Sequence, residues 1–428
     1  MVKWPKVKLA DCVNLLAGFP FKSQQFTNKP DDVPLVKGEN VSQGCILWDI
    51  SKRWLASDWE KMEKFHLLPG DVVVAMDRPW IPAGLKWAFI REGDPKALLV
   101  QRCARLRSSN GRLDQTFLRF VIGGPGFENY VIPITTGVNV PHISGQQILD
   151  FAFTLPPLPL QWQIAGILSA YDKLMENSQR RIRILEAMAR ALYREWFVHF
   201  RFPGHEKVPR VASPLGDIPK GWEVTTFGVL YNTGSGGTPS RTRPEYFIDG
   251  TIDWVKSQEL LDGFVLSTEE RITERALEES SAKLFPANAV LIALYGATIG
   301  KLAILARAAA TNQACCAILP KRAPFGREFA FLTLLLNRER IISLRLGAAQ
   351  QNISQILLRN FECLKPTNEL VRCFSEQVGP LFDGILMLQK KIQNLRRTRD
   401  LLLPRLLSGQ MELASISANG ATSYQPGA

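Results

Sequence analysis

Two polar segments in this 428-residue chain carry side chains suited to nucleic acid. FPFKSQQF at 19–26 places Lys22, Ser23 and Gln24 between aromatic residues. GGTPSRTRPEYF at 236–247 offers comparable groups after two glycines, namely Thr238, Ser240, Arg241 and Arg243. Lys and Arg bind phosphates, whereas Gln, Asn and Arg can hydrogen-bond to base edges. Either segment alone is equally consistent with ordinary surface, but their recurrence in both halves favours nucleic-acid binding.

Further polar residues follow short apolar runs that predict strands. PLVKGENV (34–41) parallels DWVKSQEL (253–260), and LLPGDVVVAM (67–76) parallels LFPANAVLIAL (284–294). The remaining candidate DNA contacts lie in or just after these runs, and they are Lys37, Asn40, Arg78, Lys256, Gln258, Tyr295, Thr298 and Lys301.

No set of residues predicts catalysis or a bound cofactor. YGATIGKL (295–302) is one residue short of a phosphate-binding loop and has Leu302 where the metal-binding hydroxyl belongs. No Ser-His-Asp or Cys-His arrangement is present, nor the Asn/Asp-Pro-Pro tetrapeptide of base amino-methyltransferases. The seven cysteines are scattered and the four histidines lack metal-ligand spacing with them, so we expect reduced, mostly buried thiols and no metal.

The charge balance points to a polyanionic partner. Lys and Arg number 52 against 40 Asp and Glu, which gives a net charge of +12. Nucleic acid is the first expectation and an acidic membrane surface the second. The N-terminus lacks the features of a signal peptide and no apolar run is long enough to span a bilayer, so we expect a cytoplasmic protein without membrane contact.

Two long helical segments must position these side chains. Apolar residues recur at alternating steps of four and three, which predicts a coiled-coil-like seam. The first seam is Ile164, Leu168, Tyr171, Met175, Ser178, Ile182, Leu185, Ala189, Leu192 and Trp196. Adding 210 gives the second, Phe374, Val378, Leu381, Ile385, Leu388, Ile392, Leu395, Arg399, Leu402 and Leu406. Ser178 and Arg399 are the polar exceptions. We expect the second helix to be kinked or ended by Pro380 and Pro404.

The junction before each helix is also repeated, as ISGQQILDFAFTLPP (143–157) and ISQILLRNFECLKPT (353–367). The sequence therefore predicts an internal duplication of the α+β class, with two mixed domains and two long antiparallel helices related by an approximate two-fold axis. The predicted parts are a first domain at 1–154, a helix at 155–201, a linker at 202–222, a second domain at 223–365, a helix at 366–412 and a disordered tail at 413–428. A helix of about 36 residues is about 54 Å long, more than one turn of B-DNA.

The chain resembles the specificity (S) subunit of Type I restriction–modification systems. The resemblance rests on the helical regions at 143–197 and 395–413, supported by GFPFKSQQF, SGGTPSRTRPEYF and YGATIGKLAIL followed by ATNQACCAI (310–318). It covers nearly the whole chain, up to about residue 413. Pro380 is an unusual feature within it.

The resemblance implies a non-catalytic subunit that recognises double-stranded DNA. Each target-recognition domain would read one half of a bipartite site, and the helices would fix the gap and dock two methylation subunits. Those partners carry S-adenosylmethionine, and separate restriction subunits cleave. An excess of aromatic and apolar residues beyond the seam predicts docking at Tyr193, Phe197, Leu401, Leu403 and Leu407. A coiled-coil adaptor without DNA preference, or an enzyme acting on nucleic acid by itself, remain alternatives.

Overall fold

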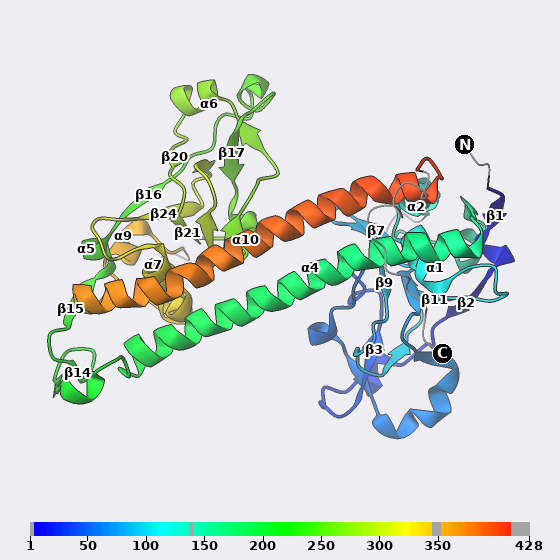
Figure 1. Ribbon diagram of the computed structural model, residues 1–428, viewed down its shortest axis with the longest axis horizontal. Coiled ribbons are helices and arrows are strands. Elements are labelled where there is room, and N and C mark those ends of the chain that lie inside the picture. The colour runs from blue at the N-terminus through cyan, green and yellow to red at the C-terminus, as the bar shows by residue number, and fades with distance from the viewer. Residues whose placement is uncertain (1–3, 137–139, 345–351, 412–428) are drawn as a thin grey trace. The chain divides into compact units, whose positions relative to one another are not determined.

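The computed structural model describes residues 4–136, 140–344 and 352–411 (Figure 1). The predicted tail at 413–428 lies outside the described residues. The chain divides into two compact units: unit 1 is Met1–Leu174 with Leu395–Ala428, and unit 2 is Met175–Asn394. Each long helix therefore contributes one part to each unit.

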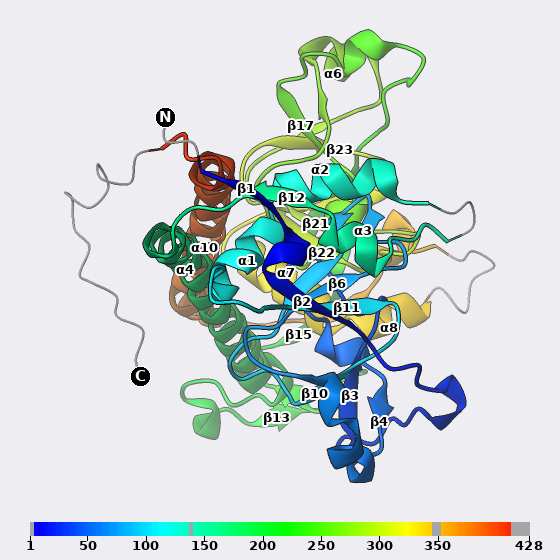
Figure 2. The ribbon, with the colours of Figure 1, turned by 90° about the vertical axis from the view of Figure 1, so that its right-hand side faces the viewer.

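Unit 1 contains two four-stranded sheets, and all of their strands except β5 are labelled in Figure 1 or Figure 2. One has the order β4-β3-β10-β5, with bounds Arg53–Trp54, Val33–Val36, Ala97–Leu99 and His66–Leu67. The other has the order β2-β11-β6-β9, with bounds Val13–Ala17, Cys103–Ser108, Val72–Ala75 and Trp87–Phe89. Two short pairs are β1 (Lys6–Lys8) with β12 (Ala152–Thr154) and β7 (Trp80–Ile81) with β8 (Gly84–Leu85). Its short helices are α1 (Gln115–Ile122), α2 (Pro125–Ile134) and α3 (Gly145–Leu149).

Unit 2 repeats this plan with one more strand. Its smaller sheet is β19-β17-β23-β20, at Arg271–Ile272, Ile252–Val255, Ala309–Thr311 and Leu284–Phe285. The larger is β16-β24-β21-β22-β18, at Tyr231–Ser235, Cys315–Pro320, Val290–Ala293, Leu302–Leu305 and Gly263–Val265. Two pairs are β15 (Glu223–Thr226) with β25 (Glu362–Lys365) and β13 (Arg210–Val211) with β14 (Ile218–Pro219). The short helices are α5 (Phe227–Leu230), α6 (Glu274–Glu279), α7 (Arg327–Leu336), α8 (Arg338–Ser343) and α9 (Gln355–Arg359).

The strand orders of the two units correspond, apart from the additional strand β18 of unit 2. In each unit one sheet contains a parallel pair, β3 with β10 and β17 with β23. The other sheets share the antiparallel order β2-β11-β6-β9 and β16-β24-β21-β22. Such agreement in order and direction confirms the predicted internal duplication and the α+β class.

One glycine in each unit is required by a close backbone crossing. A Cβ atom on Gly18 would lie 2.3 Å from the carbonyl oxygen of Val100, and one on Gly236 would lie 1.9 Å from that of Thr311. Real Cβ atoms do not approach oxygen so closely, so only glycine fits. These crossings bring the segments that follow, FPFKSQQF and GTPSRTRPEYF, alongside the ends of β10 and β23.

The repeated junction closes each domain in the same way. The hydroxyls of Ser144 and Ser354 accept hydrogen bonds from backbone N–H groups three residues on, which caps α3 and α9. The N–H groups of Ile143 and Ile353 donate to the carbonyls after β6 and β21, both at 2.9 Å. Phe151 and Phe361 are buried behind these caps. The recurrent Ile, Ser and Phe are thus explained by packing and capping.

The long helices are α4 (Leu158–Tyr193), extended by a π-helical turn η6 (Arg194–Val198), and α10 (Asn368–Leu407). No residue of either predicted seam is exposed. In unit 1, Ile164 and Leu168 share a core with Leu403 and Leu406. In unit 2, Ile182 packs with Ile385 and Leu388, and the Ala189–Phe197 end of the first helix packs with Val371–Val378. The residue numbers run in opposite directions, so the helices are antiparallel in both units.

The two polar exceptions of the seam lie in different surroundings. Ser178 is buried. Arg399 donates to the carboxylate of Asp172 at 2.8 Å, and Arg119 of α1 donates to the other oxygen of the same carboxylate at 2.6 Å. This ion triad ties both long helices to the sheet domain of unit 1.

The expectation that Pro380 or Pro404 ends the second helix is wrong. The helix continues through both prolines from Asn368 to Leu407. Both prolines are exposed, so the carbonyl that each leaves without an N–H partner faces solvent rather than the seam. Among the described residues, no helix combines the length and apolarity needed to cross a membrane.

Candidate nucleic-acid interface

The candidate residues of unit 1 gather where parallel strands end. Strands β3 and β10 run in the same direction, so Lys37 and Val100 meet at one edge. Beside them, the N–H of Met76 donates to the carbonyl of Arg102 at 2.7 Å, which adds the turns before β11 and after β6. We define the loop edge of unit 1 as residues 19–25, 37–40, 77–86, 101–102 and 141–142.

Unit 2 builds the same edge from equivalent turns. The N–H of Leu294 donates to the carbonyl of Ala314 at 2.8 Å, as Met76 does to Arg102. The hydroxyl of Thr238 donates a hydrogen bond to the amide oxygen of Gln313. This bond holds the loop that follows Gly236 and Gly237 against the turn after β23. The loop edge of unit 2 comprises residues 237–243, 256–259, 295–301 and 312–314.

Most of the unit 1 candidates present free polar groups at this edge. Lys22, Ser23 and Gln24 are exposed around the short helix η2 (Ser23–Gln25), and Arg78 is exposed in the turn after β6. Lys37 is partly buried, lies over the ring of Phe26 and pairs with Glu39 at 2.9 Å.

The prediction that Asn40 contacts DNA is wrong. Its side chain is fully buried and donates to the carbonyl of Leu35 at 3.0 Å and to the hydroxyl of Ser51 at 2.6 Å. Its amide oxygen accepts from the N–H of Lys37 at 2.8 Å. With these bonds made inside the domain, the amide shapes the turn after β3 and is not available to DNA.

In unit 2 the basic candidates are held by carboxylates. Arg241 and Lys256 both contact Glu270, and Lys256 also pairs with Glu269 at 2.6 Å. The hydrogen bond from Arg241, with that from Lys256, lowers the pKa of Glu270 to about 2. The guanidinium of Arg241 also lies 4.4 Å from the ring centre of Phe247. The structure thus brings two predicted DNA contacts, 15 residues apart in sequence, onto one carboxylate.

The other unit 2 candidates divide between paired and open groups. Arg243 pairs with Glu245 and Glu279, both at 2.8 Å, and Lys301 pairs with Asp262 at 3.0 Å. The remaining four are polar residues, either exposed or partly buried, at the same edge: Ser240, Gln258, Tyr295 and Thr298. Surface ion pairs contribute little net free energy, so phosphate groups can replace these carboxylates at small cost.

Sequence reasoning missed several residues at the same edges. Gln101 and Gln313 hold equivalent positions after β10 and β23, and both are exposed. Lys86 is the unit 1 equivalent of Lys301, since their carbonyls accept from Ala75 and Ala293 at 3.0 and 2.9 Å. The similarity of LKWAF (85–89) to GKLAI (300–304) could have found it. Arg102 and His142 carry no comparable signal.

The comparisons with known proteins identify the family. The family described as "Type I restriction modification DNA specificity domain" matches residues 1–187 and 219–366. The chain belongs to this family. Each matched range contains one loop edge and the junction to a long helix.

Curated specificity subunits are related over most of the chain. The Type I restriction enzyme MjaIX specificity subunit of Methanocaldococcus jannaschii is 25% identical over 305 residues, 70% of each chain. The HindI specificity subunit of Haemophilus influenzae is 22% identical over 333 residues, 63% of this chain and 71% of that one. A crystal structure of a Type I restriction–modification S subunit from M. genitalium matches with a TM-score of 0.60 and 14% identity, over 95% of this chain and 96% of that one. The last match supports the fold.

In this specificity-domain protein, the residues predicted to dock partners are largely buried. Tyr193 and Phe197 are each only 6% exposed and pack on Phe329 and Phe374 in the core of unit 2. Leu403 is buried in unit 1 and Leu407 is partly buried. The docking prediction is therefore wrong for the aromatic pair, whose excess over the seam reflects this core. Leu401 alone is well exposed, at 57%.

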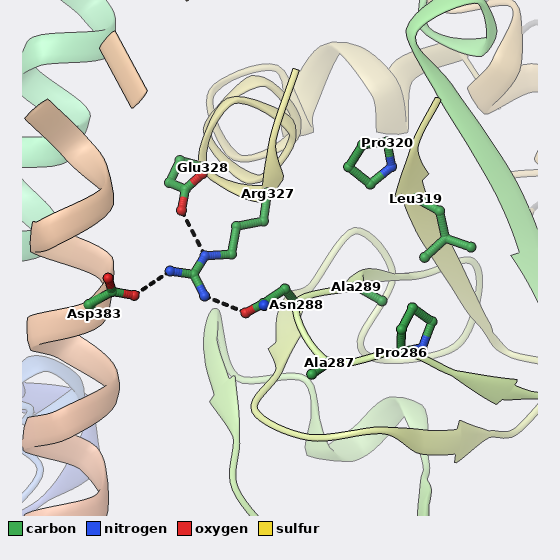
Figure 3. Close-up of a pocket in the computed structure, with 9 residues that line it drawn as sticks. All are labelled: Pro286, Ala287, Asn288, Ala289, Leu319, Pro320, Arg327, Glu328 and Asp383. Atoms are coloured by element: carbon green, nitrogen blue, oxygen red, sulfur yellow. Dashed lines mark hydrogen bonds and ion pairs between the residues drawn. The ribbon is translucent and has the colours of Figure 1, made fainter. Parts of the chain in front are cut away.

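A pocket of about 550 Å³ in unit 2 surrounds Arg327 (Figure 3). The guanidinium donates to Asn288 in the turn before β21, to Glu328 of its own helix and to Asp383 of α10. In unit 1 the helix that follows the equivalent strand is α1. It begins with Gln115, whose side-chain amide donates a hydrogen bond to the carbonyl of Gly70 at 2.8 Å. Arg327 thus fastens the sheet to a long helix.

All seven cysteines are free, and five of them are buried. No cluster of metal-binding side chains occurs among the described residues.

Proposed function

We propose that the chain is the DNA sequence-recognition subunit of a Type I restriction–modification system, in which each loop edge reads one half of a two-part site. The observation that carries this proposal is that the family matches both repeats and that each repeat builds the same edge from different polar residues. A shared frame with divergent side chains is what two different half-sites require.

The chemistry of the edges fits base reading as well as phosphate binding. Gln101 and Gln313 are exposed at equivalent places, and a glutamine amide can form two hydrogen bonds to adenine. At Gln313 the amide oxygen would accept a hydrogen bond from the base in addition to that from the hydroxyl of Thr238. The basic groups around them supply the sequence-independent part of affinity.

In this proposal the chain catalyses nothing itself. Methylation subunits that carry S-adenosylmethionine modify adenine, and restriction subunits cleave. The alternative of an adaptor without DNA preference is not favoured, because the family is defined by DNA specificity.

We further propose that a methylation subunit docks on an outer face of α4 in unit 2. Ile184 and Met188 lie four residues apart on one face and are 50% and 51% exposed. An apolar pair on a polar helix face suits a partner surface. Met188→Asp should abolish co-purification of the methylation subunit, whereas Gln179→Asp, an exposed polar position on the same helix, should not. Unchanged co-purification of the Met188 variant would exclude this face.

The experiment for the main proposal is modified-base sequencing of host DNA with and without the gene. Loss of adenine methylation at one gapped, two-part motif is expected. If methylation remains unchanged while the gene is expressed with its methylation partner, the proposed function is wrong.

A further inference from the structure

Two arginines in unit 1 are held in a backbone conformation that arginine rarely adopts. Arg78 has φ of 45° and Arg102 has φ of 69°. Among the described residues, the other non-glycine residues with positive φ are Phe200, Asp249, Asp262 and Asn288. Left-handed backbone is unfavourable for residues other than Gly, Asn and Asp.

The two strained arginines meet at the loop edge of unit 1. The carbonyl of Arg102 accepts a hydrogen bond from the backbone N–H of Met76, which lies two residues before Arg78. The backbone N–H of Arg78 in turn donates to the carbonyl of Pro141 at 2.6 Å. The turns that carry both arginines are thus fixed by hydrogen bonds to their neighbours.

The repeated fold does not require arginine at either place. The equivalent of Arg78 in unit 2 is Gly296, which has φ of 81°, and the equivalent of Arg102 is Ala314, which is not left-handed. A glycine would satisfy the turn after β6 without strain. Strain retained at a position that the fold can build without it points to a function of the side chain.

A single carboxylate organises this cluster. Asp77 accepts a hydrogen bond from Nδ1 of His142 at 2.7 Å, and its other oxygen lies 3.8 Å from Nε of Arg102. The Arg102 side chain is nevertheless 60% exposed. One side of the Arg102 side chain therefore faces the Asp77 carboxylate, and the rest is open to a ligand.

The rest of the cluster keeps a positive charge. The amine of Lys86 donates to the carbonyl of Gly38, and the side chain of Arg78 is exposed. No acidic side chain within the described ranges forms an ion pair with Arg78 or Lys86. An electron-rich ligand surface is expected to face this edge.

We propose that Arg78 and Arg102 read guanine in the half-site bound by unit 1. A phosphate contact needs only a positive charge, which a flexible lysine supplies without backbone strain. A bidentate contact to O6 and N7 of guanine needs a guanidinium plane of fixed direction. The left-handed backbone fixes where both side chains leave the chain, and the Asp77 carboxylate lies beside that of Arg102. This inference rests on the proposed function and deepens it, because it assigns one base type to one unit.

The test uses the full chain co-expressed with its methylation subunit, and modified-base sequencing of host DNA. The variants are Arg78→Gly and Arg102→Gly, which suit left-handed backbone, and Arg102→Lys, which keeps the charge but loses the fork. Each variant should weaken the requirement for guanine at one position in one half of the motif. Discrimination against other bases there should fall by about 5- to 150-fold. The other half of the motif and the gap should stay unchanged. The control is Asp249→Gly. Asp249 is also left-handed but lies in unit 2, and its replacement should leave the motif intact.

The outcomes separate this inference from the function it rests on. Absence of any two-part motif for the wild-type chain defeats the proposed function. A wild-type motif that the arginine variants leave unchanged, or methylation that falls uniformly without relaxing a position, overturns the guanine assignment alone. A lysine variant that behaves like wild type also overturns it. If a glycine variant does not fold, as judged by thermal unfolding, the lysine variant of the same residue, Arg78→Lys or Arg102→Lys, decides.

Discussion

At the scale of single residues, Asn40 and Gln101 show that one amide chemistry serves two purposes at the same edge. The Asn40 amide is fully buried and makes its hydrogen bonds to Leu35, Lys37 and Ser51 inside the domain, whereas Gln101 is exposed at the same loop edge. Residue type alone does not separate these roles, because burial decides which partner the amide meets.

Asn40→Ala should therefore weaken the fold and leave DNA recognition unaltered. Losing the amide leaves the carbonyl of Leu35 and the N–H of Lys37 without their partners, which should lower the free energy of unfolding by about 1–3 kcal/mol. Urea denaturation measures the loss, and modified-base sequencing should return the wild-type motif. A variant of full stability with an altered motif would restore Asn40 as a base-reading residue.

The ion network of Glu270 makes a prediction about acid stability. Its pKa is lowered to about 2 by the hydrogen bond from Arg241 and by Lys256, from an ordinary value of 4.5. The ionised carboxylate therefore stabilises the fold above pH 4.5, and this contribution is lost as the pH falls through about 2. Wild-type and Glu270→Gln proteins should differ in free energy of unfolding at neutral pH and converge across this window.

Urea titrations at a series of pH values measure the convergence. Glu269→Gln is the matched control, since Glu269 contacts Lys256 but not Arg241 and its side chain is 69% exposed. A constant difference between wild type and Glu270→Gln across the window would contradict the assigned network.

At the scale of elements, the helix pair combines an apolar seam with one ion triad. Asp172 of α4 bridges Arg119 of α1 and Arg399 of α10. The side chains of Asp172 and Arg119 are largely buried. Arg399 interrupts an otherwise apolar seam, so its charge needs this partner.

Asp172→Ala should lower the free energy of unfolding by about 2–3 kcal/mol, because two cations lose their shared carboxylate. Asp400→Ala is a close control, since Asp400 also pairs with Arg399 but is 54% exposed, and it should cost less than about 1 kcal/mol. Thermal or urea unfolding compares the two. Equal losses would mean that burial of the triad does not set its contribution.

The elements were far more predictable than the loop edges. The seam and the duplication follow from local periodicity and from matching residues 210 apart, both of which are properties of the sequence itself. The networks at the edges join residues such as Arg241 and Glu270, 29 positions apart, through the three-dimensional course of the loops. Left-handed arginines and the burial of Asn40 are likewise set by tertiary contacts. The prediction that Pro380 could end the helix failed for a similar reason, because the effect of a proline depends on which side of the helix it faces.

At the scale of the whole molecule, the basic side chains behind the net charge of +12 are paired differently at the two loop edges. In unit 2, Arg241, Arg243, Lys256 and Lys301 all hold carboxylates, whereas in unit 1 Lys22 and Arg78 are exposed without an ion pair among the described residues. The two edges should therefore differ in how much of their affinity comes from phosphate contacts.

Lys22→Ala should weaken DNA binding by the assembled complex equally for all sequences. If Lys22 neutralises one phosphate, its loss should reduce the slope of log affinity against log salt concentration by about 0.9, while the methylated motif stays the same. Salt-titrated binding to duplexes with and without the motif measures both effects. Lys220→Ala, an exposed position outside both loop edges, should leave the slope unchanged. A changed motif would assign Lys22 to base reading, and an unchanged slope would remove it from the interface.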